Sequence, residues 1–239
     1  MKKVGLIGGT LFYEEASLRN IGKEHVSNRF GTADVHVSDR FIYVARHGTQ
    51  PDQYIHPHVI DHPATMQALK DLGATEVIGV HSTGSLKKEL KPGMIVIPDD
   101  FISLAHTATA VSNRVKHITP ALDEPLRRQL YAAAEAASIT VIDGGVYWQT
   151  TGPRLETRAE IRFISRFADL VGMTMASEAI VCRELDIPYA SICSIDNYGN
   201  GLIEKPLNAD EIRDGAQRNA KNVLAVINVY LDRRERNIS

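Results

Sequence analysis

The sequence is poor in cysteine, tryptophan and long apolar runs. Its 239 residues include two cysteines, Cys182 and Cys193, and one tryptophan. Two cysteines cannot build a disulfide framework or a four-thiolate metal site, and their apolar surroundings indicate inert core side chains. The longest apolar runs, such as Val4–Ile7 and Met94–Ile97, fall far short of the roughly 20 residues that a membrane span requires.

Positively and negatively charged residues are nearly equal in number. The 27 Lys+Arg and 29 Asp+Glu give a formal net charge of −2. The chain therefore offers no electrostatic reason to expect a nucleic-acid partner or an anionic membrane. The segment Met1–Val4 enters a strand pattern at once, without the apolar region or cleavage site of a signal peptide. We expect a soluble, cytoplasmic protein.

Short apolar runs alternate with amphipathic stretches, which is typical of an α/β sheet flanked by helices. The pattern predicts strands at Val4–Gly8, Phe41–Ala45, Glu76–Val80, Met94–Pro98, Ile139–Tyr147, Leu170–Gly172 and Tyr189–Ile195. It predicts helices at Ala64–Leu72, Glu124–Ala137, Arg158–Arg166, Ser177–Leu185 and Ala209–Leu231, the last capped by Asn208. No repeat, low-complexity tract or linker divides the chain, so we expect a single domain over residues 1–239.

Polar motifs follow the predicted strands, at the edge where open α/β sheets bind ligands. Gly8-Gly9-Thr10 lets the backbone approach a ligand and adds a hydroxyl, although it equally fits a tight turn. Arg46-His47-Gly48 offers a guanidinium fork and an imidazole to an oxyanion, or forms a solvated strand edge. His81-Ser82-Thr83-Gly84-Ser85 supplies hydroxyls and backbone N–H groups suited to phosphate or a planar ring, or an ordinary polar turn.

Three further motifs lie in the second half of the chain. In Gly152-Pro153-Arg154-Leu155-Glu156-Thr157, proline and glycine fix a turn, Thr157 caps the next helix and Glu156 lies near its start. Gly172-Met173-Thr174 ends a strand and opens a helix, where Thr174 can bind an anion. Asp196 and Asn197 end the next strand and point to opposite sides, so we expect one of them to face a ligand.

Histidines cluster in His56-Pro57-His58, with Asp61 and His62 close behind. Histidine and carboxylate are zinc ligands, but the irregular spacing and Pro57 fit no helical pair of ligands. The pattern favours a loop over a polar site, and we expect no metal here.

Taken in order, these motifs resemble the family of methylthioadenosine phosphorylases and trimeric purine nucleoside phosphorylases. The likeness covers nearly the whole chain and runs through Gly8-Gly9-Thr10, Arg46-His47-Gly48, Gly84-Ser85-Leu86, Pro92-Gly93, Gly152–Thr157, Gly172-Met173-Thr174 and Tyr189–Ile192. The resemblance implies an α/β domain on a mixed, distorted sheet, and a homotrimer with active sites at subunit interfaces. It implies that phosphate attacks C1′ of a purine nucleoside and releases the base and a pentose 1-phosphate, without metal or organic cofactor.

The resemblance also assigns roles by position. Asn197 and His47 would be catalytic, because phosphorolysis passes through an oxocarbenium-like state that positioned phosphate and a stabilised leaving base promote. The phosphate ligands would be Thr10, Arg46, His47, His81, Ser82 and Thr174. The substrate ligands would be Thr83, Gly84, Leu155, Glu156, Met173, Asn197, Gly199, Ala209 and Ile212, with His117 reaching in from the neighbouring subunit.

Two positions favour a 6-oxopurine base. Family members that act on 6-aminopurines typically carry serines in the segment Leu155–Thr157 and an aspartate at position 197, whereas this chain has Glu156 and Asn197. A glutamate carboxylate accepts the N1–H of hypoxanthine or guanine, while adenine N1 is itself an acceptor. Asn197 can donate to O6 or N7, and Gly199 stands where adenine-type sites have a second acid. We therefore expect inosine, guanosine or 5′-methylthioinosine as the substrate.

The 5′ group and several departures leave alternatives open. Ala209 and Ile212 would make the 5′ pocket apolar, which suits a methylthio group. The family pattern is broken at Asp61, Thr65, His81 and Ser177. The alternatives are a 5′-methylthioadenosine phosphorylase, a nucleoside hydrolase that uses water, and a purine-nucleoside-binding homologue with little turnover.

Overall fold

Parallel strands buried on both faces form the centre of the structure. The computed structural model describes residues 3–12, 18, 21–49, 54–105, 108–112, 115–204 and 209–236, without the side chains of 10, 209–214 and 218. The central strands lie in the order β4 (Phe41–Ala45), β1 (Lys3–Gly8), β5 (Ala74–Ser85) and β11 (Tyr189–Tyr198). Burial on both faces explains why their sequences are nearly continuous apolar runs.

Antiparallel pairs extend this centre into one mixed sheet of 11 strands within the described residues. At one edge, the hairpin of β2 (Lys23–Asn28) and β3 (Gly31–Val37) joins β4. Beyond β5 the sheet divides into two branches. One contains β10 (Leu170–Gly172), β9 (Val146–Gln149) and β7 (Asp100–Ser103); the other contains β11, β6 (Ile95–Ile97) and β8 (Ile142–Asp143). The expected mixed, distorted α/β sheet is confirmed.

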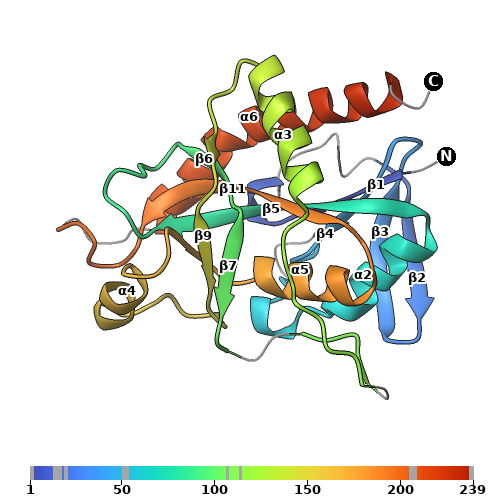
Figure 1. Cartoon of the computed structure of the whole chain (residues 1–239), viewed down its shortest axis with the longest axis horizontal. Helices are drawn as coiled ribbons and strands as arrows, with labels where there is room; N and C mark the ends of the chain where they lie inside the picture. The colour runs from blue at the N-terminus through green and yellow to red at the C-terminus, as the bar shows by residue number, and fades with distance from the viewer. Residues whose placement is uncertain are drawn as a thin grey trace.

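Helices cover both faces of the central strands (Figure 1). One pair, α3 (Glu124–Ala136) and α6 (Ala209–Arg236), packs on the face that carries Ile78 and Val80 of β5. The other pair, α2 (His62–Asp71) and α5 (Met175–Glu184), packs on the opposite face. A shorter helix, α4 (Arg158–Ile164), lies beside β9, and two 3₁₀ turns, η1 (Thr10–Phe12) and η3 (Pro57–Val59), complete the elements.

Two expectations about the strands were wrong. The predicted strand Ile139–Tyr147 is divided into β8 and β9, because Gly144 and Gly145 adopt φ values of 92° and 122° that no extended strand contains. The hairpin β2–β3 was not predicted, because β2 has the sequence KEHVSN and is mostly exposed at the sheet edge. Edge strands of this kind carry charge instead of an apolar face, so the usual strand signal is missing.

The histidine cluster mainly serves the start of α2. The Asp61 carboxylate caps this helix by accepting the Ala64 N–H at 2.8 Å, and His62 is buried beneath it. The rings of His56 and His58 lie 5.9 Å apart on η3. Within the described ranges, no three His, Cys, Asp or Glu side chains are grouped to hold a metal ion. Within the same ranges, no helix combines the length and apolarity needed to cross a bilayer. The predicted cap Asn208 lies outside them.

Candidate active site

The carboxyl ends of the parallel strands open into a cavity of about 170 Å³, which we call the inner cavity. The predicted site residues that line it are Arg46, His47, His81, Ser82, Thr83, Gly84, Leu155, Glu156, Met173, Thr174, Asn197 and Gly199. Further lining residues that were not predicted are Gly9, Tyr54, Pro57, Val171, Gly172 and Asn200. Segments far apart in sequence meet here because parallel strands end at one sheet edge.

Four predicted residues are not placed at this cavity. The side chains of Thr10, Ala209 and Ile212 lie outside the described part of the structure. His117 is exposed and lies apart from the residues that line the inner cavity of its own chain. Its predicted contact with a neighbouring subunit stays a prediction.

The Arg46 guanidinium is hydrogen-bonded to the protein, so only part of it is available to a ligand. Its Nε donates to Glu178 Oε1 at 2.7 Å, its Nη1 donates to the Val80 carbonyl at 2.7 Å, and its Nη2 reaches the Ile7 carbonyl at 3.4 Å. Gly9 permits this packing, because a Cβ there would lie 2.7 Å from Nη1. Arg46 was predicted to offer a bidentate fork to an oxyanion or to form a solvated strand edge, and in the structure part of the guanidinium is already bound to the protein. Of its five N–H donors, three are used by the protein.

Glu178 is the acid that balances Arg46. Both side chains are almost fully buried. Burial alone would raise the pKa of the Glu178 carboxyl, but the charge of Arg46 and the approach of His81 hold that pKa well below its usual range. Tyr189 donates its hydroxyl hydrogen to Glu178 Oε2 at 2.8 Å, and burial beside this carboxylate raises the pKa of Tyr189. The pair is therefore ionised, and together its two charges cancel.

His81 connects this ion pair to Thr174. Its Nε2 lies 3.0 Å from the Tyr189 hydroxyl and its Nδ1 lies 3.1 Å from Thr174 Oγ1. Burial and the charge of Arg46 lower the pKa of His81 to about 4, so the ring is neutral at pH 7. Because Tyr189 gives its hydrogen to Glu178, we assign the His81 hydrogen to Nε2 and the acceptor to Nδ1. Arg46 Nη2 also lies 3.4 Å from His81 Nε2. Since both of these nitrogens then carry hydrogen, this contact is not a hydrogen bond.

Thr174 lies at the first turn of α5, where backbone N–H groups and the helix dipole favour an anion. Its hydroxyl is buried and makes no cap within the helix. The contact with His81 Nδ1 therefore determines where this hydroxyl points. The residue that breaks the family pattern at position 81 thus contacts a predicted phosphate ligand directly.

His47 presents a hydrogen-bond acceptor to the inner cavity. Its Nδ1 lies 2.8 Å from the Ile55 carbonyl, which can only accept, so Nδ1 carries the hydrogen. Burial and the neighbouring Arg46 charge lower the pKa of His47 to about 4. Nε2 of the neutral ring is then an acceptor. It can take the hydrogen of a monoprotonated phosphate.

We expect the protein to lose stability steeply in mild acid. Burial is the first cause that lowers the pKa values of His47, His62 and His81 from 6.5 to about 4. Each histidine is neutral when folded and takes up a proton on unfolding below about pH 6.5. The free energy of unfolding should therefore fall between pH 6.5 and 4, by about 1.4 kcal/mol per pH unit for each histidine.

Calorimetric melting across this pH range measures the effect. His62→Gln should lower the slope of stability against pH by the contribution of one histidine. His62 suits this test because it is buried and does not line the inner cavity. His58→Gln, which alters an exposed histidine, is the matched control and should leave the slope unchanged. A wild-type stability that stays flat from pH 6.5 to 4 would contradict the neutral, buried state of these side chains.

An amide and a carboxylate also line the inner cavity. Asn197 Nδ2 donates one hydrogen to the Tyr198 carbonyl at 2.8 Å, which leaves the second hydrogen and Oδ1 for a ligand. Its neighbour Asp196 is buried and accepts the Ser194 hydroxyl, away from the lining. A register shift between Ile195 and Asn197 marks this point of β11.

Two hydrogen bonds hold Glu156 in place. Thr150 Oγ1 donates to its carboxylate Oε1 at 2.7 Å, and Asn200 Nδ2 donates to its backbone carbonyl at 3.1 Å. The next residue begins α4 with the predicted cap: the Thr157 hydroxyl accepts the Glu160 N–H, and the Glu160 carboxylate accepts the Thr157 N–H. The turn is thereby fixed on both sides of the carboxylate.

Besides the unpredicted lining residues, three residues that contact this site were assigned no role from the sequence: Glu178, Tyr189 and Thr150. Glu178 had a usable signal, because it is a carboxylate among Met175, Ala176, Ala179 and Val181, on a helix that must bury this side. An acid in such surroundings needs a buried partner. Tyr189 and Thr150 have no comparable signal, since Tyr189 is an ordinary strand residue and Thr150 an ordinary polar residue after a strand until the fold is known.

Comparisons with known proteins identify the family of the chain. The family model described as "Phosphorylase superfamily" matches residues 3–232. A protein of Archaeoglobus fulgidus named probable 6-oxopurine nucleoside phosphorylase is 40% identical over 229 residues, covering 94% of this chain and 93% of that protein. A Methanocaldococcus jannaschii protein named probable S-methyl-5′-thioinosine phosphorylase is 33% identical over 236 residues, covering 96% and 92%.

A solved structure shows the same fold. Methylthioadenosine phosphorylase from Schistosoma mansoni, in complex with adenine, matches with a TM-score of 0.88 at 25% identity. The match covers 97% of this chain and 91% of that one. The chain therefore belongs to the phosphorylase superfamily, and within it the chain is an enzyme of the purine nucleoside phosphorylase family.

Proposed function

We propose that the enzyme cleaves the N-glycosidic bond of a 6-oxopurine nucleoside with inorganic phosphate, yielding the purine base and a pentose 1-phosphate. One observation carries the proposal: a single cavity is lined by Arg46, His47 and Thr174 and also by Glu156 and Asn197. The first group suits an oxyanion, and the second suits a flat heterocycle with both a donor and an acceptor edge.

Phosphate is bound by hydrogen bonds more than by net charge. The Arg46 charge is already balanced by Glu178, so the remaining guanidinium N–H groups, Ser82 and the first turn of α5 supply the donors. His47 Nε2 accepts the phosphate hydrogen. A phosphate oxygen attacks C1′ while the bond from C1′ to N9 breaks and its electron pair passes to the purine. Fixed donors accelerate this step because they need no reorganisation.

Glu156 and Asn197 stabilise the leaving purine. The Glu156 carboxylate accepts N1–H, and Asn197 donates its free amide hydrogen toward O6 or N7, where negative charge develops. Adenine would place its N1 lone pair against the carboxylate, which is unfavourable. The reaction uses phosphate as a co-substrate and requires no metal or organic cofactor.

We propose 5′-methylthioinosine as a substrate beside inosine and guanosine. The support is the apolar character of Ala209 and Ile212 at the aligned start of α6, and the name of the Methanocaldococcus relative. A 5′-methylthioadenosine phosphorylase is the second candidate, favoured by the likeness to the Schistosoma structure. The two differ only at the base, and Glu156 and Asn197 support the 6-oxopurine.

A product assay tests the proposal. Purified enzyme is given inosine, guanosine, adenosine, 5′-methylthioinosine and 5′-methylthioadenosine, each with and without phosphate. We expect hypoxanthine or guanine to be released only when phosphate is present. Release without phosphate would indicate a hydrolase, preference for adenine nucleosides would contradict the base assignment, and binding without release would indicate a homologue with little turnover.

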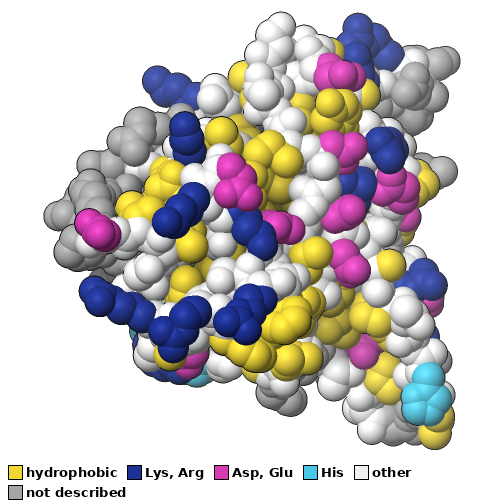
Figure 2. Space-filling view, turned by 60° about the vertical axis from the view of Figure 1, so that its left-hand side comes forward, with side chains coloured by type: hydrophobic (Ala, Val, Ile, Leu, Met, Phe, Trp, Pro, Cys, Tyr) yellow, Lys and Arg dark blue, Asp and Glu magenta, His cyan; other side chains and the backbone are white. Residues whose placement is uncertain are grey.

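We further propose that the enzyme forms a homotrimer. The support, beyond the family resemblance, is a group of exposed apolar side chains around α4 and the end of β7. Leu104, Phe163 and Phe167 are 77%, 57% and 55% exposed, unusually high for such large apolar groups. Figure 2 shows apolar side chains lying between charges of both signs on the face turned forward there. Sedimentation velocity measures the assembly state directly.

A further inference from the structure

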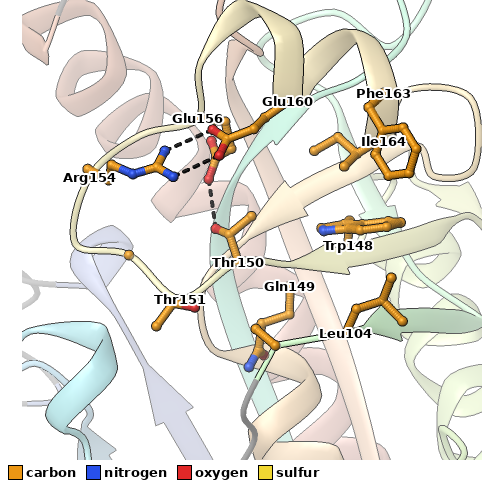
Figure 3. A pocket seen from close by; sticks show the side chains of 12 residues that line it. Leu104, Trp148, Gln149, Thr150, Thr151, Arg154, Glu156, Glu160, Phe163 and Ile164 are labelled. Carbon is orange, nitrogen blue, oxygen red and sulfur yellow. Dashed lines mark hydrogen bonds and ion pairs between the residues drawn. The ribbon is translucent and has the colours of Figure 1, made fainter.

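Thr150 lies behind the carboxylate proposed to recognise the base. It follows β9 directly, and its Oγ1 lies 2.7 Å from Glu156 Oε1 (Figure 3). The same Oγ1 lies 3.4 Å from the Gly172 carbonyl. Both of these neighbours are acceptors, so the single hydroxyl hydrogen goes to the nearer one, the carboxylate.

The backbone fixes the place of this hydroxyl. The Thr150 N–H donates to the Gly172 carbonyl at 2.8 Å, which ties residue 150 to the end of β10. Glu156 itself is carried by the turn between β9 and α4. The hydrogen bond therefore anchors a carboxylate from a turn to the sheet, and the χ angles of Glu156 are restricted by a rigid element.

The nearby cation, Arg154, does not hold the Glu156 carboxylate. Arg154 directs its Nη1 and Nη2 to the two carboxylate oxygens of Glu160, at 2.8 and 2.7 Å. Figure 3 shows this pair beside, and separate from, the contact between Thr150 and Glu156. Among the described residues, it is Thr150 that donates a hydrogen bond to the Glu156 carboxylate.

We propose that Thr150 is a positioning residue that sets the base specificity by holding Glu156 as an acceptor. This inference rests on the proposed function. With Oε1 occupied by Thr150, Oε2 remains for the N1–H of a 6-oxopurine.

The test compares Thr150→Val with Thr150→Ser. Valine keeps the shape but loses the hydroxyl, so the ratio of kcat/KM for inosine to that for adenosine should fall roughly tenfold, as for loss of a hydrogen bond to a charged group. Serine should restore most of the ratio. Thr151→Val is the matched control: Thr151 is exposed, lies outside the inner cavity and should leave the ratio unchanged.

A double-mutant cycle shows whether Thr150 acts through Glu156. Glu156→Ser alone should lower the inosine preference, and adding Thr150→Val should have no further effect, because the partner is already absent. Binding of hypoxanthine and adenine by calorimetry provides a readout without turnover: Thr150→Val should weaken hypoxanthine roughly tenfold and leave adenine unchanged.

The possible failures can be told apart. A wild-type enzyme that prefers adenosine contradicts the proposed function and, with it, this role of Thr150. A wild-type enzyme that prefers inosine, with the same preference in Thr150→Val, overturns the role of Thr150 alone. An equal loss in the wild-type and Glu156→Ser backgrounds would also overturn it, because Thr150 would then act without Glu156.

Discussion

Asn197→Ala should lower kcat for inosine by about 10²–10³, the usual cost of removing one donor from a site of developing charge. The Asn197 amide is oriented before substrate arrives, because one of its hydrogens is already bound to the Tyr198 carbonyl. Its remaining hydrogen serves the purine as the glycosidic bond breaks. Since this contact strengthens only in the transition state, kcat should fall much more than the KM for phosphate rises.

Steady-state kinetics with varied inosine and varied phosphate measure the change in kcat and the change in KM separately. Asn197→Asp is the informative companion, because it keeps the size of the side chain but replaces the donor with an acceptor. It should be at least as slow on inosine as the alanine variant. Turnover near the wild-type value in Asn197→Ala would show that the base-site assignment is wrong.

Breaking the buried pair of Arg46 and Glu178 should destabilise the protein by about 3–5 kcal/mol, because either single change leaves one charge buried without its partner. The two side chains are 3% and 1% exposed, so solvent reaches little of either charge. Glu178→Gln and Arg46→Met are the single variants. Urea unfolding measures the loss of stability.

The double variant Arg46→Met with Glu178→Leu separates stability from catalysis. Replacing both charges with apolar groups should recover much of the free energy of unfolding. Phosphorolysis should stay at least about 10²-fold below wild type, because the guanidinium donors are gone. A double variant that recovers stability and activity together would remove Arg46 from the phosphate site.

Lys23→Gln is the control for this series. Lys23 and Asp34 form a 2.8 Å ion pair on the exposed edge hairpin, with side chains 42% and 51% exposed. Pairs of this kind contribute little to stability. If Lys23→Gln cost as much as Glu178→Gln, the burial argument for the Arg46–Glu178 pair would be wrong.

The sequence was most informative where apolar runs and polar motifs alternate. The strand Phe41–Ala45 and the strand Leu170–Gly172 have the predicted bounds, because each is an apolar run ended by polar residues or glycine. The polar motifs converge on one cavity for a topological reason, because parallel strands present their carboxyl ends at one edge. That inference needs the order of elements but no atomic contact. The motif His81–Ser85 was predicted to follow its strand, whereas it forms the last part of β5 (Ala74–Ser85).

The partners of the predicted residues could not be derived in the same way. Arg46 and Glu178 are 132 positions apart, and nothing in either motif reveals that α5 places the acid against the guanidinium. The sequence suggested an unoccupied fork, whereas the fold uses three of its donors. Similarly, Thr150 and Glu156 are six positions apart on either side of a turn, and only the shape of that turn directs the hydroxyl toward the carboxylate.

Glu156 separates two spaces. It lines the inner cavity and also a second, outer cavity of about 380 Å³, whose wall includes Leu104, Trp148 and Phe163. A molecule that covers this opening, such as another copy of the chain, would lower the local dielectric and strengthen every electrostatic contact that Glu156 makes with the base. If the proposed homotrimer covers this opening, an isolated protomer should discriminate less between purines than the assembled enzyme.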